Sequence, residues 1–407
     1  MKKVIVIGAG PAGMMAAITA AKDGNEVILL ESNEKVGKKL FITGKGRCNV
    51  TNSKDISEFF DFIPGNPHFL YSALYSYTNE DTINFFESQG IRLKSERGGR
   101  VFPSSDKSSD IIKGLLRELN NNKVDIRLNS KVTDIIYKNP LIDGVKVNDN
   151  YILTADNYII ATGGISYPLT GSTGDGLKFS KKVGHKITNL KGSLVPIELN
   201  NSWIREIVGL TLRNIGISLY EIDKKKPLYK DQGEVLFTSY GISGPLALKA
   251  SRYINDDLKY YIYLDLKPAL TLEELDLRVQ KDFKKYINKE FKNSLDDLFP
   301  KKLIPIIISL SNINENKKVN EITKEERKSL VILIKGIKLT IRKLRPIEEA
   351  IVTSGGVDTL EIDPSTMKSK LINNLSFAGE VIDIDAYTGG YNVQIALSTG
   401  YLAGSNI

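Results

Sequence analysis

The residues with the clearest chemical meaning form a glycine-rich segment near the start of the chain. Gly8, Gly10 and Gly13 follow an apolar run, Val4–Ile7, and lead into an alanine-rich run, Ala12–Lys22. Strand, glycine turn and helix in this order predict a dinucleotide-binding unit. Gly8 would permit the tight turn, Gly10 would let a pyrophosphate approach the backbone, and Gly13 would let helix and strand pack closely. The N-terminus of the helix would offer N–H groups to the phosphates.

An acidic residue stands where such a unit binds ribose. Glu31 follows the apolar segment Glu26–Leu30 and lies 18 residues after Gly13. This is close to the ~20 residues that the motif requires. A carboxylate at this position favours a free ribose diol, as in FAD or NAD, over a 2′-phosphate.

Two later segments favour FAD over NAD. Ile159–Gly164 reads as a strand that ends in a turn of small residues, as in glutathione-reductase-like flavoproteins. Leu375–Ala378 reads as a strand that runs into Gly379 and Glu380, and Gly389–Asn392 opens a helical stretch to Ala403. The N-terminus of that helix would face the flavin pyrimidine edge, where negative charge accumulates on reduction. An NAD site does not need this third segment, so the sequence predicts non-covalent FAD.

A basic, glycine-rich loop is predicted just after the ribose acid, at Gly37–Lys39 and Thr43–Asn52. Such a loop supplies N–H donors to the pyrophosphate and flavin, and an ordinary surface loop is the alternative. Cys48 is the single cysteine, so we expect it to have a structural or flavin-lining role rather than a disulfide relay. The predicted cofactor-binding residues are Gly8, Gly10, Pro11, Ala12, Gly13, Glu31, Ser32, Lys38, Lys39, Gly44, Arg47, Cys48, Asn49, Val132, Ala161, Thr162, Gly163, Gly379, Glu380, Gly390, Tyr391 and Asn392.

Composition narrows the class of protein. One cysteine and two histidines, His68 and His185, argue against a metal centre, and both histidines are expected to be packed or at the surface. No apolar run reaches the ~18 residues that span a bilayer, and the first residues lack the features of a signal peptide, so we expect a cytoplasmic protein without membrane contact. The net charge of +8 falls within Lys267–Arg345, which holds 19 Lys and Arg against 11 Asp and Glu. Solvated helix faces explain most such excesses, and steering of an anionic partner is the alternative.

The predicted fold class is α/β, with the nucleotide domain interrupted by two insertions. Strands are expected at Asp125–Leu128, Val132–Tyr137 and Tyr158–Ala161, whereas short alternating segments such as Ile215–Tyr220 and Tyr260–Leu264 indicate a β-rich part. The predicted domains are residues 1–190 with 346–407 for FAD, 191–267 for the β-rich insertion and 268–345 for a helical cap.

The helical cap is predicted from capping boxes and apolar periodicity. Thr271 with Glu274, and Thr323 with Glu326, have the spacing that opens a helix. Apolar residues at helical spacing are expected to pack in its core: Leu272, Leu275, Val279, Phe283 and Tyr286.

Together these segments resemble the BaiN/RdsA-like flavoproteins, a family that includes enzymes described as aminoacetone oxidases. The resemblance runs nearly the whole length and implies a glutathione-reductase-like Rossmann FAD domain, an inserted β-barrel-like domain and a small helical cap. The activities it implies are reduction of conjugated enones in steroid-like acids and oxidation of amines by oxygen. The motifs that carry it are Gly8–Gly13, Gly44–Asn52, Ser172–Gly176, Leu194–Pro196, Phe237–Pro245, Gly355–Met367, Gly379–Glu380 and Gly390–Asn392.

Candidate catalytic residues are Arg100, which would anchor a carboxylate, and Tyr240, which would supply a proton; Arg97 is a further candidate on the substrate side. A structural role is the alternative for each. No second strand–GxGxxG–helix unit occurs, so NAD(P)H would have to bind transiently over the flavin.

Three functions follow as hypotheses, all with FAD as cofactor. The first is an NAD(P)H-dependent reductase of an unsaturated carbonyl compound, and the second is an oxygen-dependent oxidase of a small amine. The third is an RNA-binding flavoprotein that uses the basic helical region, but that region lacks aromatic residues interleaved with the basic ones. A small-molecule substrate is therefore expected rather than nucleic acid, and the oligomeric state stays open.

Overall fold

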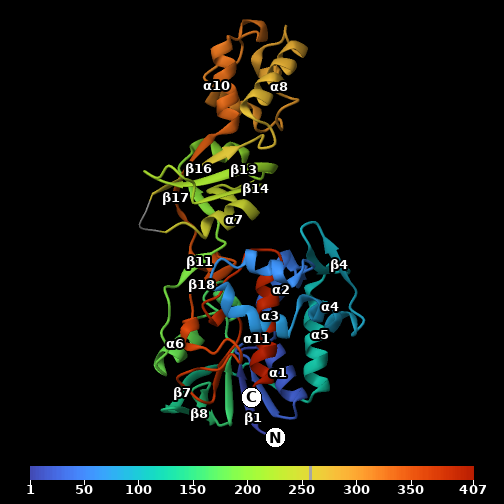
Figure 1. Ribbon diagram of the computed structural model, residues 1–407, viewed down its shortest axis with the longest axis vertical. Coiled ribbons are helices and arrows are strands. Elements are labelled where there is room, and N and C mark those ends of the chain that lie inside the picture. The colour runs from blue at the N-terminus through green and yellow to red at the C-terminus, as the bar shows by residue number, and fades with distance from the viewer. Residues whose placement is uncertain (256–258) are drawn as a thin grey trace. The chain divides into compact units, whose positions relative to one another are not determined.

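A computed structural model describes residues 1–255 and 259–407. The chain forms two compact units, one made of residues 1–193 and 347–407 and the other of residues 194–346. Each unit has its own hydrophobic core. The predicted α/β class, with a barrel contributed by the middle of the chain, is confirmed (Figure 1).

The first unit is built on a five-stranded parallel sheet with the strand order β19-β10-β1-β2-β6. The apolar runs predicted as strands are buried, as expected for a parallel sheet covered on both faces. β19 comes from the far end of the chain, so the sheet is completed only after the whole second unit. The strands are β1 (Lys3–Ile7), β2 (Glu26–Leu30), β6 (Asp125–Arg127), β10 (Asn157–Ile160) and β19 (Leu375–Phe377).

Two helices from opposite ends of the sequence pack tightly in this unit: α1 (Pro11–Lys22) and α11 (Tyr391–Ser405). Figure 1 shows them side by side, α1 in blue and α11 in red. A Cβ atom on Gly400 would lie 2.3 Å from the Ala12 carbonyl oxygen, and one on Gly404 would lie 2.5 Å from that of Ala16. Glycine at these positions therefore sets the close approach of α11 to α1.

Smaller elements surround this centre. A three-stranded antiparallel sheet has the order β3-β5-β4, another has the order β7-β8-β9, and β11 pairs with β18. The elements are α2 (Lys38–Gly46), α3 (Tyr71–Ser76), α4 (Asn79–Glu87), α5 (Ser108–Asn121), α6 (Asp175–Lys182), β3 (Thr51–Asn52), β4 (Leu93–Glu96), β5 (Arg100–Pro103), β7 (Val132–Lys138), β8 (Leu141–Val147), β9 (Tyr151–Leu153), β11 (Lys191–Ser193) and β18 (Val352–Ser354).

The second unit contains a closed barrel with the strand order β12-β15-β14-β13-β16-β17. Ile215, Ile217 and Leu219 of β13 are buried, and the residues between them are not, which is the alternation of a barrel wall. The elements are β12 (Ile197–Leu199), β13 (Thr211–Glu221), β14 (Tyr229–Phe237), β15 (Gly241–Ser243), β16 (Tyr260–Asp265), β17 (Ile337–Leu344) and the helix α7 (Pro245–Ser251).

Three helices lie between β16 and β17: α8 (Leu272–Lys285), α9 (Ile304–Ser311) and α10 (Lys324–Lys335). Both predicted capping boxes are present, one at the start of α8 and one at the start of α10. The helices share one hydrophobic core with the barrel. The described helices belong to the same compact unit as the barrel. A helical cap that forms a domain of its own therefore stays a prediction.

Two details of the predicted helical region differ from expectation. Leu272 is 47% exposed, so the prediction that its side chain packs in the core is wrong. It is the first residue of α8, where the end of the helix is open to solvent. Leu275, Val279 and Phe283 are buried as expected. Ile337–Leu344 is strand rather than helix, because it pairs with β16 and β12 and closes the barrel.

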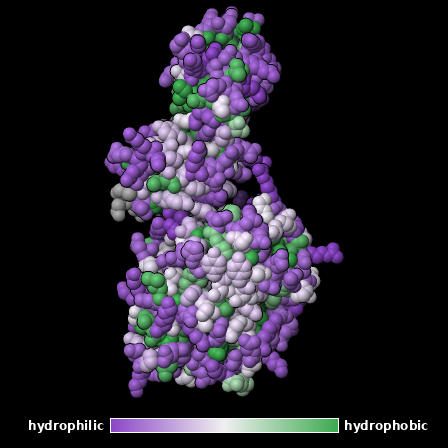
Figure 2. All heavy atoms as spheres, in the orientation of Figure 1, coloured by the Kyte–Doolittle hydropathy of each residue, from purple (hydrophilic) through white to green (hydrophobic). Residues whose placement is uncertain are grey.

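Other predicted strands and helices agree with the structure apart from end residues, which shift by up to four positions, the largest shift being at the start of β13. Within residues 1–255 and 259–407, no helix is both long and apolar enough to cross a membrane. The face shown in Figure 2 is mostly hydrophilic.

Candidate cofactor site

The predicted glycine turn links β1 to α1, and two of its glycines are required by the protein's own packing. Gly8 has φ +102°, and a Cβ atom there would lie 2.6 Å from the Ala161 carbonyl oxygen. A Cβ atom on Gly13 would lie 1.9 Å from the Gly8 carbonyl oxygen. Neither position can accept a side chain while the helix, turn and strand keep these distances.

Gly10 differs, because nothing in the protein requires glycine there. Its φ of −77° suits any residue, and a Cβ atom would have no heavy atom within 4 Å. No side chain caps the N-terminus of α1 at this point. Open space in front of uncapped helical N–H groups is the arrangement that a dinucleotide pyrophosphate needs. The turn therefore fits the predicted cofactor.

Glu31 follows β2 and lies against the same turn. It is 8% exposed, and its Oε2 atom accepts a hydrogen bond of 2.9 Å from the Ala9 backbone N–H. Its Oε1 atom accepts from the backbone and side-chain nitrogens of Asn33 at 2.9 and 2.7 Å, and the Ser32 hydroxyl donates to it at 3.2 Å. Lys38 donates to Asn33 Oδ1 at 3.0 Å. These bonds fix the carboxylate beside the proposed phosphate position.

Three strand ends of the parallel sheet converge on the start of α1. Gly379, at φ +74°, follows β19, and a Cβ atom there would lie 2.8 Å from Ala12 Cβ. Ala161 follows β10 and touches Gly8, and Thr162 and Gly163 continue the same turn. The carboxyl edge of a parallel sheet is where ligands of this fold class bind.

Lys39 and Glu380 form an ion pair beside this edge, with 2.7 Å between Nζ and Oε2. Ser166 joins them, since its Oγ accepts from Lys39 at 2.7 Å and donates to Glu380 Oε1 at 3.0 Å. The Thr353 backbone N–H donates to the same Oε1 atom at 2.8 Å. The predictions included Lys39 and Glu380 but missed Ser166 and Thr353, which no local pattern in the sequence distinguishes.

The predicted basic loop begins as a helix. Gly37, at φ +67°, caps α2, so the prediction that Lys38 and Lys39 lie in a loop is wrong. Leu40 is buried and holds this turn of helix against the core. The chain leaves helical geometry at Thr43 and Gly44, and the second part of the expected loop follows there.

The residues after this break are tied down by the protein. The Arg47 guanidinium bonds Asp106 at 2.7 Å, pairs with Glu96 and lies 4.1 Å from the centre of the Phe102 ring. Cys48 is fully buried, and burial raises the pKa of its thiol to about 12. The thiol is therefore neutral at physiological pH, in line with the expected structural role.

Two buried polar atoms of the predicted set have no hydrogen-bond partner among the described residues: Asn49 Oδ1 and Thr162 Oγ1. Buried polar atoms are usually paired with protein, water or ligand. Asn49 lies in the second part of the basic loop and Thr162 lies in the turn after β10, and both segments were predicted to contact the cofactor. Polar groups of bound FAD would satisfy such atoms, which is a second respect in which the residues fit it.

The N-terminus of α11 is fixed to the end of the basic segment. A Cβ atom on Gly390 would lie 2.2 Å from the Thr51 carbonyl oxygen, and Asn52 Nδ2 donates to the Gly389 carbonyl at 2.9 Å. Tyr391 is buried against Phe59 and Phe62, and Asn392 bonds the Ala386 backbone through both side-chain atoms. Both side chains thus serve packing, and no side chain caps the N-terminus of α11.

The remaining predicted residues lie elsewhere in their units. Val132 begins β7 and is buried in the core. Arg100, in the first unit, is 46% exposed and lies 3.8 Å from Glu96, and its Nε donates to the Arg97 carbonyl. Tyr240, in the second unit, has the Arg345 guanidinium 4.7 Å from its ring centre. Arg100 and Arg97 are thus in contact with each other.

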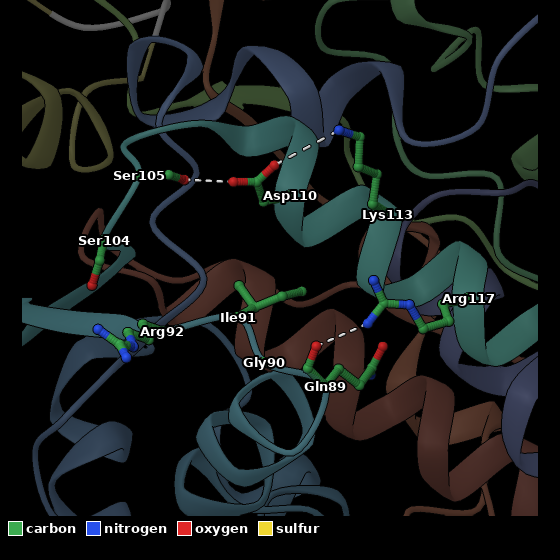
Figure 3. A pocket seen from close by; sticks show the side chains of 9 residues that line it. All are labelled: Gln89, Gly90, Ile91, Arg92, Ser104, Ser105, Asp110, Lys113 and Arg117. Atoms are coloured by element: carbon green, nitrogen blue, oxygen red, sulfur yellow. Dashed lines mark hydrogen bonds and ion pairs between the residues drawn. The ribbon is translucent and has the colours of Figure 1, made fainter.

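A separate polar hollow of about 400 Å³ lies in the first unit between the α4–β4 turn and α5 (Figure 3). In it Asp110 accepts from Ser105 at 2.6 Å, and Arg117 donates to the Gln89 carbonyl at 2.8 Å. None of the predicted cofactor residues lines it. The lining residues are Gln89, Gly90, Ile91, Arg92, Ser104, Ser105, Asp110, Lys113 and Arg117.

The histidines take ordinary structural roles. His185 is buried and bonds Glu361 at 3.0 Å and Ser369 at 2.8 Å, while His68 stacks on Tyr71. In the part of the chain that the structure describes, no three His, Cys, Asp or Glu side chains are grouped to hold a metal ion.

The sequence model of a family described as "HI0933-like protein Rossmann domain" matches residues 2–406. The chain belongs to this family. It is 32% identical to a 3-dehydro-bile acid delta(4,6)-reductase of Clostridium scindens over 99% of this chain and 98% of that protein. It is 31% identical to a ribosomal RNA dihydrouridine synthase of Haemophilus influenzae, over 99% and 98% of the two chains.

A solved flavocytochrome c3 fumarate reductase shares the fold, with a TM-score of 0.50 and 18% identity over 100% of this chain and 78% of that one. The family and the fold confirm the resemblance drawn from the motifs. The protein is an FAD-dependent oxidoreductase.

Proposed function

We propose that this enzyme reduces a carbon–carbon double bond conjugated to a carbonyl group, with NAD(P)H as electron donor. One observation carries the proposal: the two full-length relatives described above are named for this chemistry. In a 3-dehydro bile acid the delta-4,6 double bonds are conjugated to the 3-ketone. In uridine the double bond that dihydrouridine lacks is conjugated to the C4 carbonyl. Two different substrates thus share one reacting group.

The described residues would hold the cofactor as follows. Gly10 leaves room for the pyrophosphate, the N–H groups of α1 bind it, and Glu31 accepts hydrogen bonds from the ribose. The positive N-terminal end of α11 would stabilise negative charge on a flavin bound beside it. FAD bound there supplies the hydride chemistry.

Reduction of a conjugated double bond also needs a proton donor and an anchor for the substrate. Tyr240 of the second unit is one candidate for the donor, because a phenol can give up a proton, and Arg100 of the first unit is one candidate for the anchor, because a guanidinium can bind a carboxylate or carbonyl oxygen. The Arg345 guanidinium lies 4.7 Å from the Tyr240 ring centre and is paired with Glu198 at 2.7 Å.

The first test is anaerobic stopped-flow absorbance near 450 nm of the FAD-loaded protein. Rapid bleaching by NADH or NADPH, followed by recolouring with a conjugated enone or with uridine-containing RNA, is the expected result. Bleaching by a small amine alone, with hydrogen peroxide formed on re-aeration, would replace the proposal with the amine oxidase hypothesis.

The Tyr240 assignment is tested by Tyr240→Phe beside Tyr137→Phe, a control on the exposed hairpin of the first unit. We expect Tyr240→Phe to slow recolouring by the substrate while bleaching by NAD(P)H stays unchanged. Equal recolouring rates in both variants would remove Tyr240 from the reaction.

A further inference from the structure

The outer face of the barrel carries a cluster of three tyrosines and a lysine, which we name the tyrosine face: Tyr220, Tyr261, Tyr263 and Lys338. They come from β13, β16 and β17, neighbouring strands of the barrel (Figure 1). Tyr220 is paired with Tyr261, and Tyr263 with Lys338. Residues between them in each strand are buried in the barrel core, so these four side chains point outward.

The tyrosine rings form an ordered surface. Tyr220 and Tyr261 stack with centroids 5.3 Å apart and an angle of 5° between their planes. Tyr263 meets both edge-on, at 5.3 Å from Tyr261 and 5.8 Å from Tyr220. Tyr263 is 37% exposed, and the other two are partly exposed. Lys338 Nζ lies 4.6 Å from the centre of the Tyr261 ring.

The charge on this face is positive. Lys230 of β14 is opposite Ser218, which is in turn opposite Tyr263, so Lys230 and Lys338 stand at the two ends of one row across four strands. Both lysines are exposed, and neither has a carboxylate partner among the described residues. Asp265, two residues after Tyr263, is paired with Lys335 at 2.7 Å.

We propose that the tyrosine face, with Lys230, binds single-stranded RNA. Exposed aromatic rings on a sheet stack with nucleobases, and flanking lysines neutralise phosphates. The charge of the face is complementary to a polyanion, and the stacked rings match a ligand with planar groups. An acidic protein segment would pair with the lysines but would not stack on the rings. A bile-acid-like substrate would not pair with two separated lysines.

This surface revises an expectation drawn from the sequence. Nucleic acid was not expected as a partner, because the sequence of residues 267–345 was not interpreted as an aromatic-interleaved basic stripe. The barrel supplies the aromatic residues, since it sets Lys338 of that region beside tyrosines from 220 to 263. Binding of RNA at this face is independent of the proposed reaction; the further step, that a uracil of this RNA is the conjugated group reduced, rests on the proposed function.

The test is fluorescence anisotropy of the full-length, FAD-loaded protein with a labelled oligouridine of about 12 nucleotides, near the site sizes known for stacking surfaces. We expect Tyr220→Ala with Tyr261→Ala to weaken binding about tenfold or more, and Tyr261→Phe to bind as the wild type does. The matched control is Tyr71→Ala with Tyr75→Ala, which removes another exposed stacked pair, 46% and 51% exposed, from the first unit.

Several results would overturn the proposal. These are no binding by the wild type at low salt, unchanged binding by the tyrosine variants, or the same loss in the Tyr71 and Tyr75 control. Lys338→Glu is the second variant should the double alanine protein fail to fold; it leaves the tyrosines in place and is expected to weaken binding, and wild-type affinity in it would count against the face.

The assay needs no NAD(P)H and follows no reaction, so its failure is distinguishable from failure of the proposed function. RNA binding without flavin bleaching would remove only the reductase proposal. Bleaching without RNA binding would remove only the RNA surface.

Discussion

The nucleotide turn of the first unit and the tyrosine face of the second are built in opposite ways. At the turn, side chains are absent: Gly8 and Gly13 leave no room for a Cβ atom, and Gly10 leaves its space to a ligand. At the tyrosine face, large side chains project from strands whose backbone is engaged in the barrel. A single added methyl group at the turn is therefore expected to disturb its packing or its ligand binding. At the tyrosine face, only the removal of rings or charges is expected to weaken binding.

Within the turn, one glycine is required for folding and another for ligand binding. Gly13 is needed for folding, because its missing Cβ atom lets α1 meet the Gly8 carbonyl. Gly10 is needed only when something binds. Variants at these two positions separate stability from cofactor affinity within four residues.

The largest effect is expected for Gly13→Ala. Its Cβ atom would lie 1.9 Å from the Gly8 carbonyl oxygen, so α1 must shift away from β1. Because backbone cannot move aside as a flexible side chain can, we expect a loss of about 3 kcal/mol or more in the free energy of unfolding. Urea unfolding followed by circular dichroism measures it. A variant as stable as the wild type would show that the turn tolerates a different packing.

Gly10→Ala should leave the fold intact and weaken FAD binding. We expect stability within about 0.5 kcal/mol of wild type, since the new methyl meets no protein atom. FAD affinity should fall about 10- to 100-fold, equal to about 1.4 to 2.8 kcal/mol, as the methyl occupies the space of the pyrophosphate. Titration of apoprotein with FAD, followed by flavin fluorescence, gives the two dissociation constants. Unchanged affinity would place the phosphates elsewhere.

The buried Cys48 thiol should make stability depend on alkaline pH. Its pKa is about 12 in the folded protein and 9.0 ordinarily, so above pH 9 the unfolded chain ionises while the folded one stays protonated. This contribution is fully present below pH 9 and is lost as pH rises toward 12. Relative to Cys48→Ala, the wild type should lose about 1.4 kcal/mol per pH unit above 9. Parallel stability curves of the two proteins from pH 8 to 11 would contradict the burial of this thiol.

The smallest effect concerns the lysines at the ends of the tyrosine face. Each of Lys230→Gln and Lys338→Gln should reduce the slope of log affinity for single-stranded RNA against log salt by about 0.7, the share of one phosphate contact. Anisotropy titrations at several salt concentrations measure the slope. Lys113→Gln, in the polar hollow of the first unit, is the control and should leave it unchanged. A slope that responds equally to all three changes would indicate diffuse attraction.

Local patterns in the sequence predicted the parts of the molecule that are themselves local. The Gly8–Gly13 turn, Glu31 at the end of β2 and the capping boxes of α8 and α10 each depend on residues a few positions apart, or one strand away. Their geometry follows from backbone rules that act over the same short range. Leu272 was the exception, because periodicity does not reveal where a helix extends beyond its core.

Long-range arrangements escaped prediction for a physical reason. Ser166 meets Lys39 and Glu380 only because β10 and β19 are neighbours in the sheet. The tyrosine face depends on the register of three strands, which no short segment encodes. The helix that begins at Lys38 was predicted as a loop, because glycines follow it and glycine is unfavourable in a helix.

The glycine contacts between α1 and α11 also set the order of events during synthesis. The first strand, turn and helix leave the ribosome long before β19 and α11 exist, yet α1 buries Met14 and Met15 in a core that these later elements complete. The nascent chain must therefore keep this apolar helix from aggregating while the entire barrel unit is made. We expect flavin to be captured only after α11 has been made and has packed on α1.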